Sequence, residues 1–162
     1  MSMQQKQHNY RFVFKIVVIG PNEYLNDKVL RLISHSNIMV DGIGVHIGRV
    51  TSESVKISYW NPHQNAIEVL VGLSYQGAKG ALIVSPKEDT EAAVRYRTEI
   101  KKKCGNIPTS ILLIDKNKTF EAIRKITDLM IRELVVRIRK SLRKKSKSGM
   151  HFDLKLSYNE NS

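Results

Sequence analysis

The fold is decided by the stretch FVFKIVVI at residues 12–19, which is followed by Gly20 and Pro21. Only Lys15 interrupts the apolar run. A run of this kind that ends in turn residues is typical of a central β-strand buried on both faces. Two more apolar runs, at residues 81–84 and 110–114, follow turn signals and predict further buried strands.

The segments between these runs carry the patterns of helices and of a hairpin. Strands that alternate with helices predict an α/β fold, with a mostly parallel sheet that is covered on both faces and has the hairpin as its antiparallel edge. Helices are expected after a cap at Asn26 or Asp27, at residues 88–103 and at residues 119–145, and the hairpin strands are expected at residues 44–50 and 54–60.

Positive charge is concentrated near the C-terminal end. The 162 residues include 27 Lys and Arg against 15 Asp and Glu, a formal net charge of +12. Residues 121–148 contain ten of the basic residues and three of the acidic ones. Such a field attracts acidic partners, membranes or nucleic acid. The side chains that we expect to bind an acidic partner are Arg137, Arg139, Lys140, Arg143, Lys144, Lys145 and Lys147.

The composition argues against several classes of site. Cys104 is the only cysteine, so the chain cannot form an internal disulfide or a multi-cysteine zinc site. The five histidines share no ligand spacing, and we expect no metal. No apolar run reaches the roughly 18 residues of a membrane span. We therefore expect a cytoplasmic protein, with peripheral attachment at the inner face of a membrane as an alternative.

Composition also divides the chain into three parts. Residues 1–9 are polar and are expected to be disordered, residues 10–136 form the folded domain, and residues 137–162 form a basic helix end with a polar tail. Within the tail, residues 152–158 alternate between apolar and polar side chains, a pattern that also fits an edge strand.

Four stretches follow one another in the order of a known family. Residues 15–20 run from a strand into a glycine, residues 41–44 read Asp-Gly-Ile-Gly, residues 64–84 lead through Gly-Ala-Lys-Gly into a strand, and residues 99–108 end in Asn-Ile-Pro. Together they resemble the small GTPases of the Ras and Rab kind. The resemblance covers residues 10–117 and implies a three-layer P-loop fold. That fold is shortened here at its C-terminal end, because a further helix and strand are missing before the last helix.

The family's phosphate-binding residues are replaced at the matching positions. Its P-loop reads Gly-x-x-x-x-Gly-Lys-Ser/Thr, in which the backbone and the lysine hold phosphates and the hydroxyl holds magnesium. In this chain Gly20 is followed in register by Leu25, Asn26 and Asp27 at the last three places. Lys28 lies two places beyond the lysine position, and Asp27 could hold a metal in place of the hydroxyl.

The family's other motifs are altered as well. Its Asp-x-x-Gly falls on residues 60–63, where neither end matches, although Gln64 occupies the place of the water-orienting glutamine and is the one catalytic candidate. Asn117 and Lys118 match the first pair of the guanine-binding Asn-Lys-x-Asp, but its aspartate is replaced by Phe120. Without that carboxylate, a guanine site loses the acceptor for hydrogen bonds from the base. The site then discriminates guanine from other bases much less strongly.

The resemblance therefore implies a pseudoGTPase, a scaffold or interaction module with a protein partner, no bound cofactor and no hydrolytic activity. One alternative is a GTPase switch with a divergent P-loop, which hydrolyses GTP to GDP with magnesium. A third hypothesis is a basic module that binds an anionic membrane surface or nucleic acid through the helix end. Under the GTPase alternative, the nucleotide would be held by Gly20, Asp27, Lys28, Asn117 and Lys118, with Gln64 acting on water.

Overall fold

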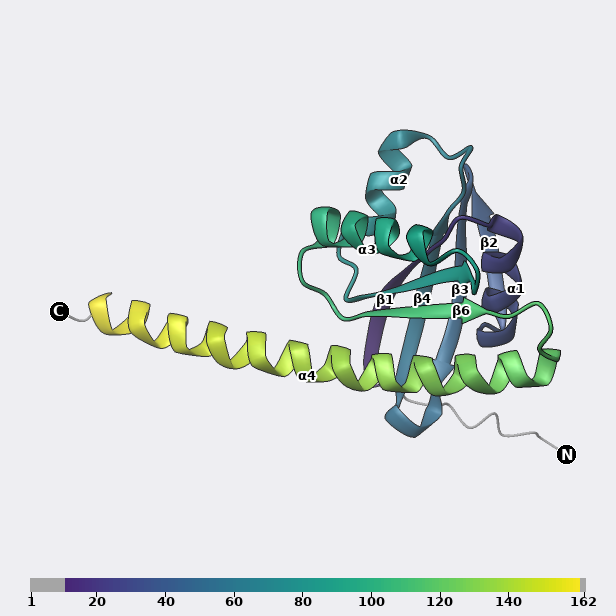
Figure 1. Cartoon of the computed structure of the whole chain (residues 1–162). Coiled ribbons are helices and arrows are strands. Elements are labelled where there is room, and N and C mark those ends of the chain that lie inside the picture. Colours follow the sequence, from purple (N-terminus) through teal and green to yellow (C-terminus); the bar gives the residue numbers. More distant parts are fainter. Residues whose placement is uncertain (1–10, 161–162) are drawn as a thin grey trace, which may run out of the picture.

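A six-stranded sheet forms the centre of the molecule. The computed structural model describes residues 11–160, with side chains described through residue 146. The strands are β1 (Phe12–Ile19), β2 (Ser36–Val40), β3 (Ile43–Val50), β4 (Val55–Pro62), β5 (Gly80–Pro86) and β6 (Thr109–Ile114). Their order is β2-β3-β4-β1-β5-β6 (Figure 1). β3 pairs antiparallel with both of its neighbours and every other pairing is parallel, so the predicted α/β fold with a mostly parallel sheet is confirmed.

Helices cover both faces of this sheet. The helices are α1 (Glu23–Ile33), α2 (Glu68–Tyr75), α3 (Thr90–Cys104) and α4 (Phe120–Glu160), and the 3-10 turn η1 spans Thr51–Glu53. On one face, α1 and α4 bury Leu30 and Ile138 against the sheet. On the other face, Tyr75 of α2 and Ile100 of α3 pack on Val17 and its neighbours. The arrangement has three layers, with the apolar strands β1 and β5 in the middle of the sheet.

The edge of the sheet differs from the expectation. Residues 36–40 form β2, which pairs with β3 and takes the edge position that the sequence assigned to the hairpin. All five residues of β2 are exposed, so no buried face marks this strand in the sequence. Asp41 and Gly42 form the turn into β3, with φ values of 48° and 82°. Positive φ at both central residues is typical of the tight turn that joins two antiparallel strands.

The last helix is longer than expected. α4 packs on the sheet through its buried Ile131, Leu134 and Ile138, and then extends beyond the body of the molecule (Figure 1). It continues to Glu160 without a break at residue 137. The edge-strand interpretation of residues 152–158 is therefore wrong, because these residues belong to α4. The Leu and Lys residues of this stretch are good helix formers, and a helix needs no sheet partner for its hydrogen bonds. The predicted disordered segment 1–9 lies outside the described residues.

Candidate functional site at the carboxyl ends of the strands

A crevice lies at the carboxyl end of β1, where sheets of this kind bind their ligands. Its volume is about 240 Å³. Gly20 and Gln64, two of the predicted site residues, both line it, whereas Asp27, Lys28, Asn117 and Lys118 do not. No lysine or arginine is among its lining residues, so the crevice offers no side-chain cation to a phosphate. These residues are Ile19, Gly20, Glu23, Asn26, Pro62, His63, Gln64, Val71, Tyr75 and Tyr96.

The loop that should wrap a phosphate is short. Only residues 20–22 separate β1 from α1, and Asn22 caps the helix by accepting a hydrogen bond from Leu25 N at 3.2 Å. The expected cap at Asn26 or Asp27 is therefore wrong, because both residues lie inside α1. A side chain at Gly20 would place its Cβ 1.9 Å from Val84 O. Gly20 is thus required by the close approach of β1 to β5, independently of any ligand.

A carboxylate already occupies the N-terminus of α1. Glu23 lies in the first turn of the helix, and its Oε1 accepts a hydrogen bond from Gln64 N at 2.5 Å. The N-terminus of a helix favours negative charge, which is why phosphates bind there in many proteins. Glu23 supplies that charge from the chain itself. The same bond uses the backbone N–H of Gln64, the residue expected to orient water.

The residues at the lysine and hydroxyl positions have other contacts. Asn26 is 2% exposed, and its Nδ2 donates to Gly20 O at 3.4 Å. Asp27 Oδ1 lies 3.7 Å from His63 Nε2. Lys28 is partly buried on α1. The structure therefore does not bring Asp27 and Lys28 together with Gly20 into one phosphate-binding arrangement.

Polar side chains are buried beside the crevice, between α1 and the sheet. His46 of β3 and Asn61 of β4 are 5% and 0% exposed. Asn61 Nδ2 lies 3.3 Å from His63 Nε2. Within the described residues, Asn26 Oδ1, His46 Nδ1 and Asn61 Oδ1 have no hydrogen-bond partner from the protein. Buried polar atoms of this kind are commonly bonded to ordered water.

His46 has the most perturbed environment in this cluster. Burial lowers the pKa of His46 from its ordinary value of 6.5. The negative charge of Asp27 opposes this shift, and His63 and Arg31 reinforce it. A histidine with a pKa below 6.5 is mainly neutral at pH 7. Sequence reasoning missed this residue, although an inward-facing histidine between Gly44 and Gly48 in an alternating strand was a usable signal.

The predicted guanine-binding residues lie in the turn between β6 and α4. Asp115 organises this turn, since its Oδ1 accepts from Asn117 N at 3.0 Å and its backbone O accepts from Lys118 N at 3.2 Å. The other carboxylate oxygen lies 3.9 Å from Lys87 Nζ. Asn117 and Lys118 are exposed, and Phe120, at the place of the base-reading aspartate, is 55% exposed. Asp115 thus stabilises the turn itself. Phe120 offers no carboxylate that could bind a guanine base.

The basic run does not form one continuous face. Arg137 Nη1 donates to Thr109 O at 3.1 Å, which ties α4 to β6. Arg139 pairs with Glu53 of η1, and its guanidinium lies 4.9 Å from the centre of the Phe12 ring. These two cations therefore stabilise the docking of α4, one on the edge strand β6 and the other on β1 and the β3–β4 turn.

The remaining cations of the run are more accessible. Lys140 and Arg143 line a small cavity of about 160 Å³ beside η1. Lys144 and Lys145 are exposed. The side chain of Lys147 lies outside the described residues. Only part of the predicted acidic-partner set is thus available on any one side of the helix.

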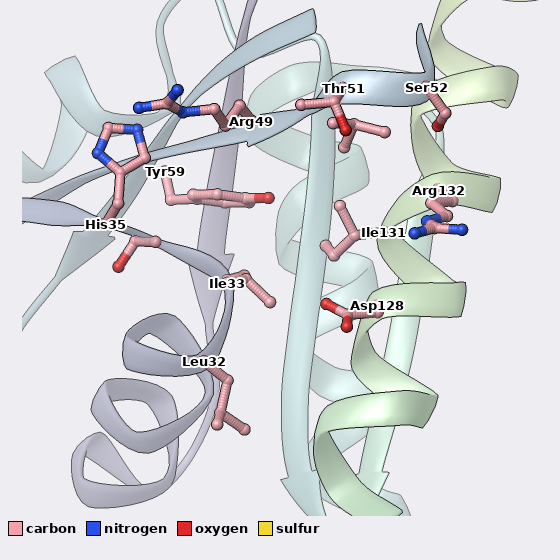
Figure 2. Close-up of a pocket in the computed structure, with 12 residues that line it drawn as sticks. Leu32, Ile33, His35, Arg49, Thr51, Ser52, Tyr59, Asp128, Ile131 and Arg132 are labelled. Atoms are coloured by element: carbon pink, nitrogen blue, oxygen red, sulfur yellow. The ribbon is translucent and has the colours of Figure 1, made fainter. Parts of the chain in front are cut away.

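A second cavity, of about 310 Å³, lies between the C-terminal end of α1, β3, η1 and α4 (Figure 2). His35 and Arg49 line one side of it, and Asp128 and Arg132 of α4 line the other (Figure 2). Burial, together with the charge of Asp128, raises the pKa of the Tyr59 phenol in its wall. Arg49 and Arg132 bring positive charge to this cavity and Asp128 brings negative charge, so its lining is of mixed sign.

Three further observations leave the function of the chain unassigned. Among the side chains described, no three from His, Cys, Asp and Glu are grouped so that they could hold a metal ion. None of the helices in the described part is both long and apolar enough to cross a bilayer. The chain matches no known family model and no curated protein.

Proposed function

We propose that this chain is a nucleotide-independent interaction module, built on a scaffold that resembles the small GTPases and has lost their phosphate chemistry. The observation that carries the proposal is the bond between Glu23 and Gln64 N, at the place where a phosphate would meet the helix N-terminus. On this proposal the chain binds a protein partner, needs no GTP, GDP or magnesium, and does not hydrolyse nucleotide.

The sheet order supports the scaffold part of the proposal. β4, β1, β5 and β6 are parallel neighbours, and β3 runs against them, as the resemblance implies. Residues 64–84 contain a helix, α2, followed by the buried strand β5, where the resemblance implies the switch II helix and the next strand. β2 is an addition at the edge of this pattern.

The charge of the crevice supports the loss of phosphate binding. Two like charges about 4 Å apart repel by about 4 kcal/mol at an effective dielectric constant of about 20. Glu23 would exert such a repulsion on a phosphate at the N-terminus of α1, and no lysine or arginine lines the crevice to offset it. A penalty of that size corresponds to about a thousandfold loss of affinity.

Exposed apolar side chains support a protein partner. Ile38, Met39 and Val40 of β2 are 63%, 57% and 49% exposed. Val69 and Leu73 on α2, which also contacts β3, are 75% and 45% exposed. Exposed apolar patches are a common mark of protein interaction sites, and β2 and α2 are therefore the elements where we expect a protein partner to bind.

The competing GTPase hypothesis is tested by the melting temperature of the purified protein with GTP and magnesium. A ligand at about 100 times its Kd stabilises a protein by about 2.7 kcal/mol, which raises the melting temperature of a domain of this size by several degrees. We expect no such shift. A shift that Lys28→Ala abolishes and that Lys125→Ala, an exposed lysine on α4, leaves intact would replace our proposal with the divergent GTPase.

A further inference from the structure

A third cavity, of about 390 Å³, lies between α3, the loop into β6, and α4. We call it the α3–α4 pocket. Three of its lining residues are cationic, no carboxylate is among its lining residues, and Asn106 and Ser141 add an amide and a hydroxyl. The three cations are Arg97 and Lys101 of α3 and Arg137 of α4.

The backbone brings these cations together from distant parts of the sequence. Arg97 and Lys101 are four residues apart on α3, so they lie on one face of the helix. Arg137 reaches the pocket from α4, and its Nη1 is fixed by hydrogen bonds to Thr109 O at 3.1 Å and Ser110 Oγ at 3.5 Å. A guanidinium has five N–H donors, more than these two bonds use.

No acidic side chain neutralises this group within residues 11–146. The ion pairs formed there by other cations include Lys103 with Glu99 at 2.9 Å, on the same helix. None of the ion pairs among the described side chains involves Arg97, Lys101 or Arg137. Like charges that converge on a cavity raise the local concentration of anions.

We propose that the α3–α4 pocket binds a phosphate group through Arg97, Lys101 and Arg137. Arginine binds phosphate with a planar fork of donors, lysine adds a point charge, and Asn106 and Ser141 can supply neutral hydrogen bonds. The volume lies within the range of small-molecule sites, about 300–1,000 Å³, so the pocket can take a phosphate together with part of the group that carries it. A phosphorylated lipid headgroup and a soluble phosphorylated small molecule share this chemistry.

The position of the pocket on α4 is compatible with either source. Lys144 follows Arg137 by seven residues, which is two helical turns, so both lie on the same side of α4. Lys144 is exposed and adjoins Lys145. These two lysines extend the positive charge along the helix away from the sheet.

The test is a calorimetric titration of the full chain with inorganic pyrophosphate. We expect saturable binding that Arg97→Gln with Lys101→Gln weakens at least about tenfold, the effect of losing charge-assisted hydrogen bonds. Both residues are exposed on α3, so the fold should survive the change. The matched control is Lys140→Gln with Arg143→Gln, which removes the same charge from α4 outside the pocket and should change the affinity less than about twofold.

Vesicles distinguish the two sources of phosphate. Phosphatidylcholine vesicles that contain phosphatidic acid present a phosphate monoester. The comparison vesicles contain enough phosphatidylserine to carry the same surface charge, but no phosphate monoester. Preference for phosphatidic acid that the Arg97/Lys101 variant loses identifies a lipid headgroup, whereas pyrophosphate binding without vesicle preference identifies a soluble ligand.

Two results would overturn the proposed phosphate site. The first is no binding of either pyrophosphate or phosphatidic acid. The second is an equal loss of affinity in both double variants, which would mean a diffuse charge effect and no site at the α3–α4 pocket.

Discussion

The crevice beside β1 and the α3–α4 pocket both lie between helices and the sheet, yet they carry opposite charge. Glu23 lines the crevice and no lysine or arginine does, whereas Arg97, Lys101 and Arg137 line the pocket and no carboxylate does. The crevice occupies the usual ligand position of an α/β sheet, and the pocket does not. The comparison teaches that a fold indicates where a ligand site commonly lies, while the charges present decide whether a given anion can bind there.

The largest expected effect concerns Gly20. Gly20→Ala should destabilise the protein by about 3 kcal/mol or more, because the new Cβ would lie 1.9 Å from the backbone oxygen of Val84. A Cβ added at Gly72 on α2 would meet no atom within 4 Å, so Gly72→Ala should stabilise by about 0.5–1 kcal/mol. Urea unfolding measures both. Equal stability of Gly20→Ala and the wild type would contradict the requirement for glycine in the packing of β1 on β5.

The next effect is a dependence of stability on pH. Burial lowers the pKa of His46 in the folded protein below 6.5, so the unfolded chain binds more protons as the pH falls below that value. Stability should therefore be full above pH 6.5 and fall below it, by at most about 1.4 kcal/mol per pH unit for this one group.

Unfolding at several pH values checks the assignment to His46. His46→Asn should reduce the slope of stability against pH. His35, which is exposed although its pKa is also lowered by slight burial, provides the control, and His35→Gln should retain most of the slope. An unchanged slope in His46→Asn would contradict the buried neutral state of His46.

A smaller effect is expected at Glu23. Glu23→Ala should cost about 1 kcal/mol, because it removes a charge-assisted hydrogen bond to Gln64 N and a favourable interaction with the α1 dipole. Glu133→Ala, in the middle of α4, should change stability by less than about 0.5 kcal/mol. Denaturant unfolding measures the loss of stability in each of the two variants. Equal losses would mean that the Glu23 carboxylate does not stabilise the N-terminus of α1 in solution.

The smallest expected effect concerns the α3–α4 pocket. Arg97→Gln should change stability by less than about 0.5 kcal/mol, since Arg97 has no acidic partner among the described residues. Arg139→Gln should cost about 1 kcal/mol, because it breaks the partly buried pair with Glu53 and the contact with the Phe12 ring. A large loss of stability in Arg97→Gln would show that the α3–α4 pocket is structural.

The sequence predicted those strands whose residues form a continuous apolar run. β1, β5 and β6 are apolar runs, and their parallel arrangement follows from the helices between them. β2 was missed because its residues are exposed and its pairing depends on the turn at Asp41 and Gly42. That Asp-Gly pair was the available signal, since it is favoured in two-residue hairpin turns.

The sites were harder to predict than the fold. Gly20 and Gln64 were identified through a resemblance, and they do line one crevice. The role of Glu23 depends on a bond to a residue 41 positions away, which no local pattern contains. The α3–α4 pocket likewise joins α3 to a residue 36 positions beyond Lys101. The sequence identified Arg137 as a partner-binding cation, but its position beside Arg97 and Lys101 depends on the fold.

The central claim is tested most directly by the nucleotide content of the purified full chain. The protein is denatured, and the released guanine nucleotide is separated and compared with the protein concentration. We predict far less than one nucleotide per chain, with and without magnesium during purification. A stoichiometric amount of GTP or GDP would contradict the claim, and its retention by the Arg97/Lys101 variant would mean that the nucleotide lies outside the α3–α4 pocket.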